Sequence, residues 1–248
     1  MPIQNVAKPW LSKEQHALRD LQLFFLCKIY SNKSRLVFKG GTALDIFYGS
    51  GRFSEDLDFD CSDLDGLAEI DEAINAIGKD SGHAVFNDWA TEREMHKSFT
   101  RYVLRVSSSG FDNLTDFIVD YTVDAPMYKP SMLLLKCGKT LTSVGVMQER
   151  EILAEKVAAI MGREKARDLY DLHFLAVVRG VQINMRDVYD KCMKEFAGKK
   201  TGYSFPSFRK RVMALKPRWN DLKPFLANNN AYKFEDVAGG VLDIFRSL

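Results

Sequence analysis

Two aspartates one residue apart, Asp56 and Asp58, are the residues of this sequence whose type and spacing best suit metal chemistry. Leu57 and Phe59 alternate with them, and Asp60 continues the pattern, which is typical of a β-strand with carboxylates on one face. Carboxylate oxygens are hard ligands, so two that point the same way can share two Mg2+ or Mn2+ ions and bind a nucleoside triphosphate. Alone, the pair is a weak signal, because alternating carboxylates usually just face water.

A glycine turn shortly before this strand could hold the phosphates of such a nucleotide. The apolar run 36–38 predicts a short strand, the glycines after Lys39 predict a turn, and residues 42–48 predict a helix that ends at Gly49. Free backbone N–H groups and the positive dipole at a helix start suit a triphosphate, and Thr42 could add a hydroxyl. Lys39 could contact the same phosphates or be only a strand-end lysine.

A third carboxylate is expected, because the attacking hydroxyl needs a base or a metal contact opposite the leaving pyrophosphate. Residues 117–123 predict a strand in which Asp120 interrupts an apolar stretch, and a charge is costly to bury there without a partner. Asp120 is therefore our candidate, although it could also lie on the solvated face of an edge strand. Asp116 and Asp124 share its face by parity and remain alternatives.

The other expected elements form an α/β half followed by a helical half. An N-capped amphipathic helix should begin after Ser12 and run to about Tyr30. The pattern further predicts a helix at 67–77, strands at 83–86 and 100–106, and a polar turn at 107–113. From about Glu149 the apolar residues recur at helical spacing. We therefore place an α/β lobe at residues 1–148 and a helical lobe at residues 149–248.

The composition is that of a globular chain without a strong charge. The 248 residues are 46% hydrophobic, which is ample for a core, and a net charge of +2 gives no global attraction to a polyanion. Four cysteines, Cys27, Cys61, Cys137 and Cys192, are widely spaced, without the spacing of a zinc site. We expect them to be reduced thiols in a soluble cytoplasmic protein, because neither a signal peptide nor a run of ~20 apolar residues is recognised.

Two blocks of the sequence match a known family. Residues 39–44 read Lys-Gly-Gly-Thr-Ala-Leu and residues 52–59 read Arg-Phe-Ser-Glu-Asp-Leu-Asp-Phe. They closely resemble the K-G-G-T-x-L and R-x-S-x-D-x-D signatures of the AbiEii/AbiGii toxin family of nucleotidyltransferases. Residues 151–159 and 163–172 resemble that family's E-x-x-x-x-K-x-x-A and R-x-x-x-R-D-x-x-D-L helices. The resemblance covers about residues 36–175, and the order of the two blocks makes it far more specific than either alone.

The resemblance implies a fold class and a set of site residues. The fold would be α/β (α+β), with a minimal polymerase-beta-like nucleotidyltransferase sheet, flanking helices and a C-terminal helical lobe. Ser54 and Asp56 would lie at the catalytic turn, Lys156 would contact the triphosphate, and Asp168 or Asp171 would organise the site from the helical side. The alternative for the last two is a helix-surface ion pair, because Asp171 lies four residues from Arg167.

A late run of basic residues offers a place for an RNA acceptor. Tyr203 and Phe205 interrupt this run, and basic side chains with interleaved aromatics suit an RNA backbone and unstacked bases. A solvated helix face would look the same. The basic residues are Lys191, Lys194, Lys199, Lys200, Arg209, Lys210, Arg211, Lys216 and Arg218.

These inferences favour a Mg2+-dependent nucleotidyltransferase that moves a nucleoside monophosphate from an NTP to an acceptor hydroxyl. Metals are assigned to Asp56, Asp58 and Asp120, and the nucleotide to Lys39, Gly40, Gly41, Thr42, Ser54, Lys156 and Arg163. By resemblance the acceptor would be the 3′ end of a transfer RNA, and a cognate antitoxin would be the partner. Ser54 of the enzyme itself is the alternative acceptor. The alternative is a catalytically silent nucleotide-binding regulatory protein with the same fold.

Overall fold

The computed structural model describes residues 8–79, 88–95, 99–107, 115–195, 202–228 and 232–248. Its contacts divide the chain into two compact units. The sheet unit comprises residues 1–49 and 53–147, and the helical unit comprises residues 50–52 and 148–248. The chain thus leaves the sheet unit for three residues, which include Arg52, before returning to it at Phe53.

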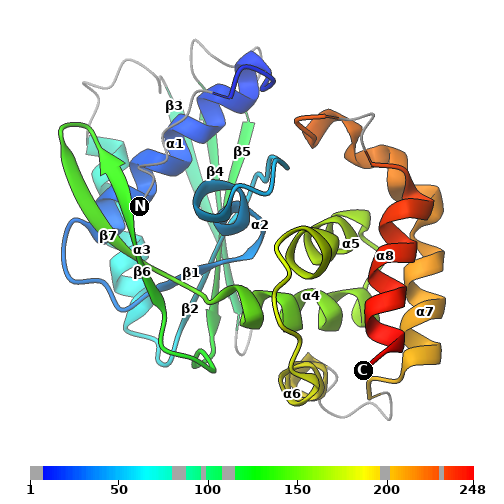
Figure 1. Cartoon of the computed structure of the whole chain (residues 1–248). Helices are drawn as coiled ribbons and strands as arrows, with labels where there is room; N and C mark the ends of the chain where they lie inside the picture. The colour runs from blue at the N-terminus through cyan, green and yellow to red at the C-terminus, as the bar shows by residue number, and fades with distance from the viewer. Residues whose placement is uncertain (1–7, 80–87, 96–98, 108–114, 196–201, 229–231) are drawn as a thin grey trace. The chain divides into compact units, whose positions relative to one another are not determined.

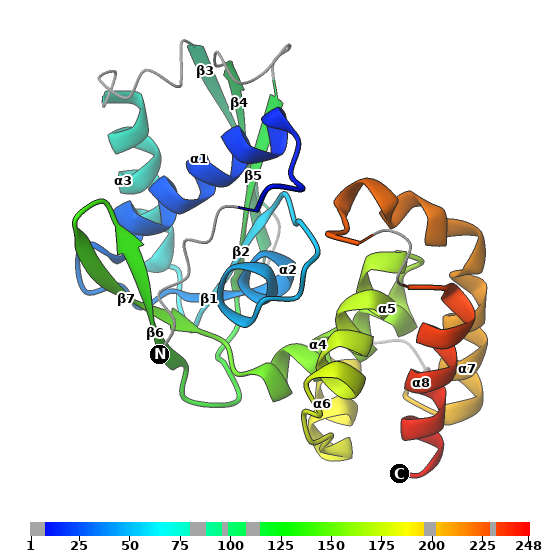
Figure 2. The same ribbon diagram turned by 45° about the horizontal axis from the view of Figure 1, so that its top comes forward.

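A mixed seven-stranded sheet forms the sheet unit within the described residues, in the order β3-β4-β5-β2-β1-β7-β6 (Figures 1 and 2). The pairs β1–β7 and β2–β5 are parallel and the other neighbours are antiparallel. The expected mixed α/β fold is confirmed. The strands are β1 (Val37–Lys39), β2 (Leu57–Cys61), β3 (Asp88–Met95), β4 (Phe99–Ser107), β5 (Thr115–Val123), β6 (Ser131–Cys137) and β7 (Thr140–Val146).

Two helices, α1 (Lys13–Tyr30) and α3 (Gly66–Lys79), cover the apolar face of this sheet. The helix α1 begins at the expected cap, where the Ser12 hydroxyl accepts from Gln15 N–H and the Gln15 side chain accepts from Ser12 N–H. The ring of Phe25 in α1 lies edge-on against Phe117 in β5, with 5.5 Å between centroids. Because successive strand residues face opposite ways, the polar side chains of these strands lie on the other face.

The glycine turn leads into a short irregular helix. An α-helical turn, α2 (Gly40–Ala43), continues as the π-helical η1 (Leu44–Tyr48) and ends at Gly49 in the left-handed conformation, with φ +75°. The predicted helix over 42–48 is therefore present, but it is wider than an α-helix in its second half. Gly49 ends it because a residue without Cβ adopts positive φ at little cost.

The helical unit is built from α-helices around an aromatic core. The rings of Phe208 and Phe245 lie 4.9 Å apart, and those of Trp219 and Phe234 lie 5.7 Å apart. Among the described residues, no helix has the length and apolar character needed to cross a membrane. The elements are α4 (Glu149–Gly162), α5 (Ala166–His173), η2 (Phe174–Val178), α6 (Met185–Glu195), α7 (Phe205–Ala214), η3 (Lys216–Phe225) and α8 (Phe234–Arg246).

The β6–β7 hairpin was not expected from the sequence. Leu135 is buried, whereas Met132 and Leu134 on the opposite face are 59% and 46% exposed. Apolar residues on both faces hide the alternation that identifies a half-buried strand. Strand β3 was also not predicted, and the strand predicted at 83–86 lies outside the described residues, as does most of the turn predicted at 107–113.

The expectation of four reduced cysteines is wrong for one pair. Cys27 in α1 and Cys137 in β6 form a disulfide, with 5.7 Å between their Cα atoms. Spacing gave no sign of it, because 110 residues separate the two and they meet only where α1 packs against the unpredicted hairpin. Cys61 and Cys192 are free and buried.

Reducing this disulfide should lower the free energy of unfolding, because the bond restricts a long loop of the unfolded chain. We expect a loss of about 2–4 kcal/mol in urea titrations with and without dithiothreitol. A Cys27→Ser/Cys137→Ser double variant should not respond to the reductant. A count of four reactive thiols, rather than the two of Cys61 and Cys192, in the unreduced protein unfolded in urea would contradict the bond.

Candidate active site on the polar face of the sheet

The carboxylates of β2 lie on the polar face of the sheet, as the alternation predicted. Leu57 and Phe59 are fully buried on the other face. Asp58, within the strand, and Asp56, just before it, are both partly exposed. Two partly exposed carboxylates on one strand face can bind a cation from solvent without the cost of opening a core.

The neighbouring strand places a third carboxylate beside this pair. The parallel register of β2 and β5 sets Asp120 directly opposite Asp58. The two alternatives lie elsewhere, since Asp116 is opposite Arg105 near the other end of β5 and Asp124 follows the end of the strand. The geometry therefore favours Asp120 over both, while its role in catalysis stays a prediction.

Arg101, which the sequence analysis did not single out, holds Asp120. It lies opposite Asp120 in the β4–β5 register and donates to both carboxylate oxygens, with Nε–Oδ1 at 2.8 Å and Nη2–Oδ2 at 2.7 Å. This hydrogen bonding, together with the charges of Asp120 and Asp56, raises the pKa of Arg101, although burial opposes the rise. The only signal in the sequence was that Arg101 lies in a strand expected to pair with residues 117–123, at a position whose side chain could share the face of Asp120.

The donor set suits Mg2+, but its third member is engaged. Asp56, Asp58 and Asp120 offer hard oxygen atoms only, as this ion prefers. Within the part of the chain that the structure describes, no group of three or more His, Cys, Asp or Glu side chains converges to hold a metal ion. Both oxygens of Asp120 already accept hydrogen bonds from Arg101, whose positive charge would repel a metal ion at the same carboxylate.

Lys39 and Asp60 form an ion pair beside the candidate metal ligands. The distance from Lys39 Nζ to Asp60 Oδ1 is 2.8 Å, and the Asp60 side chain is fully buried. A buried carboxylate needs such a partner, because its desolvation is costly. Lys39 thus has a structural task, and its predicted contact with a nucleotide stays a prediction.

The glycine turn packs closely against Asp58 of β2. Gly40 has φ +76°, and a Cβ at this position would lie 2.2 Å from Asp58 Oδ2. Gly41 and Thr42 are buried, and the Thr42 hydroxyl donates to the carbonyl oxygen of Asp56. In this arrangement the Thr42 hydroxyl holds the backbone of Asp56, a candidate metal ligand, whereas the sequence had suggested that this hydroxyl meets phosphate.

The loop before β2 is held by a buried glutamine. Gln22 of α1 donates from Nε2 to the carbonyl oxygens of Ser54, at 3.0 Å, and Glu55, at 2.7 Å. Ser54 itself is only 6% exposed. The sequence reasoning missed Gln22. The signal available was an amide side chain among the apolar positions of α1, because a buried amide needs hydrogen-bond partners.

In the helical unit, the residues of the second motif form a charge cluster around two buried carboxylates, Asp168 and Asp171. Lys156 Nζ lies 2.7 Å from Asp171 and 3.2 Å from Asp168. Arg163 donates to both oxygens of Asp168, at 2.8 and 3.0 Å. Arg52 does the same to Asp171, at 2.7 and 2.9 Å. Asp168 and Asp171 therefore pair with Lys156, Arg163 and Arg52, and not mainly with Arg167, four residues before Asp171, as the alternative of a helix-surface ion pair supposed.

The cluster keeps its carboxylates ionised. Burial acts to raise the pKa of Asp168, but the charges of Lys156 and Arg163 and their hydrogen bonds hold it below the usual value. The pKa of Asp171 is lowered in the same way, against burial, by Arg52 and Lys156. With three cations and two carboxylates, the cluster of Lys156, Asp168, Asp171, Arg163 and Arg52 carries one net positive charge.

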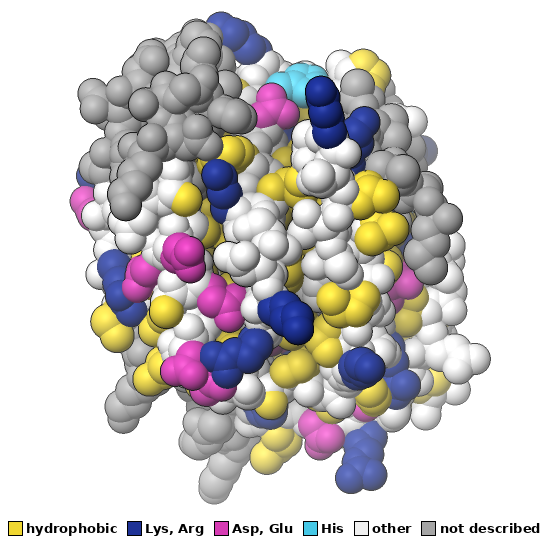
Figure 3. Space-filling model, turned by 90° about the vertical axis from the view of Figure 1, so that its left-hand side faces the viewer, with side chains coloured by type: hydrophobic (Ala, Val, Ile, Leu, Met, Phe, Trp, Pro, Cys, Tyr) yellow, Lys and Arg dark blue, Asp and Glu magenta, His cyan; other side chains and the backbone are white. Residues whose placement is uncertain are grey.

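The expected basic surface is not continuous. Lys191 is buried against Glu151 and Glu155, at 3.0 and 2.9 Å, and is not available to RNA. Lys216 pairs with Glu235 at 2.8 Å, and Tyr203 is buried. Lys199 and Lys200 lie outside the described residues. Figure 3 draws a face of the sheet unit, on which basic and acidic side chains are interspersed, and it does not bear on this run. The prediction of a basic RNA-binding run therefore fails at Lys191 and Tyr203.

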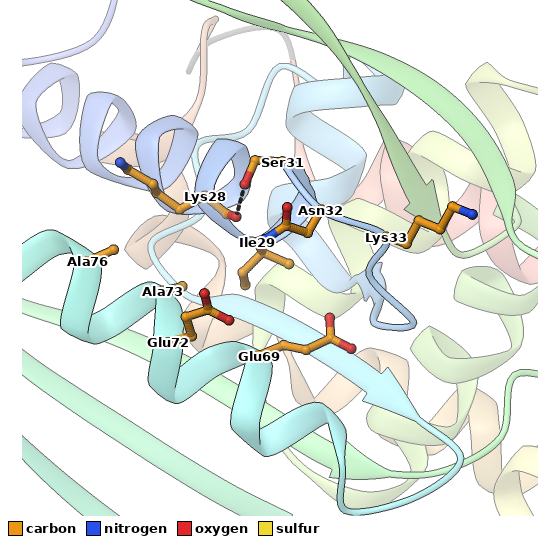
Figure 4. A pocket seen from close by; sticks show the side chains of 9 residues that line it. All are labelled: Lys28, Ile29, Ser31, Asn32, Lys33, Glu69, Glu72, Ala73 and Ala76. Atoms are coloured by element: carbon orange, nitrogen blue, oxygen red, sulfur yellow. Dashed lines mark hydrogen bonds between the residues drawn. The ribbon is translucent and has the colours of Figure 1, made fainter.

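A pocket lies apart from the carboxylates, between the end of α1 and α3 (Figure 4). These helices cover the apolar face of the sheet, whereas Asp56 and Asp58 lie on the polar face. None of the residues predicted for the site lines it. The lining residues are Lys28, Ile29, Ser31, Asn32, Lys33, Glu69, Glu72, Ala73 and Ala76.

Comparison with known proteins relates the chain to one family and to solved structures. The model of the family described as "Nucleotidyl transferase AbiEii toxin, Type IV TA system" matches residues 25–238. The structure of MenT4, a nucleotidyltransferase toxin of Mycobacterium tuberculosis H37Rv, matches with TM-score 0.66 and 19% identity, over 95% of this chain and 85% of that one. JHP933 from Helicobacter pylori matches with TM-score 0.62 and 23% identity, over 96% and 92%. No curated protein matches the sequence.

Gly40→Ala should displace Asp58, and Gly49→Ala provides a matched control. Both glycines have positive φ, at +76° and +75°, but nothing lies within 4 Å of a Cβ at position 49. Each variant should lose about 1–2 kcal/mol of unfolding free energy from backbone strain. Only Gly40→Ala should also weaken Mn2+ binding, measured by calorimetry. Equal Mn2+ affinities in the two variants would contradict the contact with Asp58.

Asp171→Asn should destabilise the protein by about 3–5 kcal/mol, because it leaves buried cations without their counter-charge. Because the pKa of Asp171 is lower in the folded protein than in the unfolded chain, its ionisation adds to the free energy of unfolding. This contribution is complete above the ordinary Asp pKa of about 3.9, and it is lost as the pH falls through the pKa of the folded protein. The variant should therefore lose less stability than the parent on acidification below about pH 5.

Urea titrations from pH 7 to pH 3 would measure both effects. Asp221→Asn is the control, since that side chain is 67% exposed and lies 4.0 Å from Arg218. It should change stability by less than about 1 kcal/mol. A similar small loss for Asp171→Asn would show that the cluster does not stabilise the fold.

Proposed function

The chain belongs to the AbiEii family of nucleotidyl transferase toxins, of the type IV toxin–antitoxin systems, and is a nucleotidyltransferase. We propose that it uses divalent metal ions at Asp56 and Asp58 to transfer a nucleoside monophosphate from an NTP. The observation that carries the proposal is the pair of partly exposed carboxylates on one face of β2. Asp120, opposite Asp58, supports it as the third ligand.

The proposed reaction joins the acceptor to the α-phosphate. The acceptor hydroxyl gives up its proton to a carboxylate of the site or to water, and its oxygen bonds to the α-phosphorus. The bond from that phosphorus to the bridging oxygen breaks, which releases pyrophosphate. Two Mg2+ ions, when bound, would neutralise charge on the triphosphate and favour the deprotonated hydroxyl. Asp56 and Asp58 would hold the ions, Gly40 leaves room for the Asp58 carboxylate, and Thr42 donates to the backbone of Asp56.

The charge cluster of the helical unit is proposed to contact an anionic group. It has one net positive charge, and the Arg163 side chain is 48% exposed. Lys156 is buried between two carboxylates, so it would act mainly by setting the charge and position of the cluster. Of the two residues predicted to contact phosphate, Arg163 is therefore the better candidate for a direct contact.

The acceptor is proposed to be an RNA hydroxyl. The Ser54 residue is only 6% exposed, so its self-modification would require the loop held by Gln22 to open. Basic side chains that remain exposed on α7 include Arg209 and Lys210, which suit contacts with phosphate. A protein antitoxin is the further proposed partner.

The alternative of a silent nucleotide-binding protein predicts a site in which metal ligands are lost or covered. Asp56 and Asp58 are both present and partly exposed, which supports turnover over silence. Both readings predict binding of NTP, so binding alone does not separate them. Release of pyrophosphate does, because it requires the α-phosphate bond to break.

Asp58→Asn should abolish pyrophosphate release, because an amide is a poorer ligand for a hard cation and removes one negative charge. The assay would use each of the four NTPs with Mg2+, with and without total RNA, and folding would be checked by circular dichroism. Asp65→Asn is the control, since this carboxylate is 77% exposed and pairs with Arg35. Turnover by Asp58→Asn at the parent's rate would reject the metal assignment, and no turnover by the parent under any condition would favour the silent alternative.

A further inference from the structure

The third carboxylate of the site already binds a cation that belongs to the protein. Both oxygens of Asp120 accept hydrogen bonds from Arg101, in a planar bidentate arrangement that is among the strongest between side chains. Asp120 lies opposite Asp58, and the negative charge of Asp56 also acts on Arg101. The same carboxylates that attract the Arg101 guanidinium would also attract a metal ion.

A metal ion and Arg101 cannot both use Asp120 freely. A divalent ion would take one or both of the oxygens to which Arg101 donates, and two positive charges at contact distance repel each other. Arg101 cannot solve this conflict by losing its proton, because a guanidinium stays protonated in proteins. While it stays at Asp120, it weakens the binding of the metal, and it relieves the repulsion only by moving away.

Arg101 has the freedom to move. Its side chain is 37% exposed, in contrast to the 11% of Asp120. Its guanidinium lies 5.4 Å from the ring centre of Phe99, two residues earlier in β4, which offers a surface for the cation when it leaves the carboxylate. By comparison, Arg52 is 3% exposed and has no such route to solvent from Asp171.

We propose that Arg101 competes with the divalent metal ion for Asp120 and so keeps metal affinity low until a nucleotide binds. The phosphates of an NTP offer a guanidinium the same bidentate acceptor that the carboxylate does. Arg101 then passes from Asp120 to phosphate, and Asp120 becomes a ligand to the metal. Metal and nucleotide would therefore bind cooperatively. This inference rests on the proposed function, because it assumes that the metal lies at Asp56, Asp58 and Asp120.

Mn2+ binding to the nucleotide-free protein tests the competition. Calorimetry would compare the parent with Arg101→Gln, which removes the competing charge, and this variant should bind Mn2+ more tightly by on the order of tenfold. Arg105→Gln is the matched control, because Arg105 is on the same strand face, 48% exposed, and pairs with Glu92 and Asp116. Its Mn2+ affinity should equal the parent's.

Two further measurements exclude a merely structural effect. Asp120→Asn added to Arg101→Gln should return the Mn2+ affinity to the parent's level or below. A non-hydrolysable NTP analogue should raise Mn2+ affinity more in the parent than in Arg101→Gln, since only the parent has the exchange of partners. Arg101→Lys, which keeps the charge without the bidentate bond, should give an intermediate affinity, and urea titrations would show that each variant is folded.

The outcomes separate this inference from the proposed function. Equal Mn2+ affinity in the folded parent and Arg101→Gln would overturn the competition, even if the parent releases pyrophosphate. Tighter binding in Arg101→Gln that does not depend on Asp120 would also overturn it. Tighter, Asp120-dependent binding without pyrophosphate release by any form would support the competition while rejecting nucleotidyl transfer as the function.

Discussion

The close approach of Gly40 to Asp58 is the contact on which the site depends. The antiparallel pairing of β1 and β2 brings the end of one strand, Lys39, opposite Asp58 in the other. The chain can turn there only because the next residue has no Cβ and accepts a positive φ. The same turn starts the helix that brings the Thr42 hydroxyl to the backbone of Asp56. One backbone constraint thus sets the positions of Asp56 and Asp58, the two proposed metal ligands.

Charge pairing is the second constraint, and it divides the carboxylates into two kinds. Asp60, Asp168 and Asp171 are fully buried, and each is neutralised by lysine or arginine. These carboxylates hold the fold, because an unpaired charge at such positions would be costly. Asp56 and Asp58 are partly exposed, so a diffusible ion can reach them from solvent. Asp120 lies between the two kinds, since it is mostly buried and paired, yet it lies beside the partly exposed Asp58.

The sequence predicted the elements whose patterns are local and missed the contacts that are not. Alternation identified the face of β2, and Ser12 and Gly49 gave helix ends, because strand period, capping and left-handed glycine are properties of a few neighbouring residues. The partners of Asp120 and Asp171 were not predicted, since Arg101 and Arg52 reach them only through strand register and tertiary packing. The disulfide was missed for the same reason. The β6–β7 hairpin was missed because its apolar residues occur on both faces.

The bond between Cys27 and Cys137 also closes a covalent ring in the chain. The ring contains Gly40, Asp56, Asp58, Arg101 and Asp120, whereas Lys156 and Asp168 lie outside it. A protease that cuts once inside the ring leaves a single molecule, whose two pieces separate only after reduction. The carboxylate site of the sheet unit is therefore retained through a single break in its own loops, while a cut between Cys137 and Glu149 divides the protein into two separate chains.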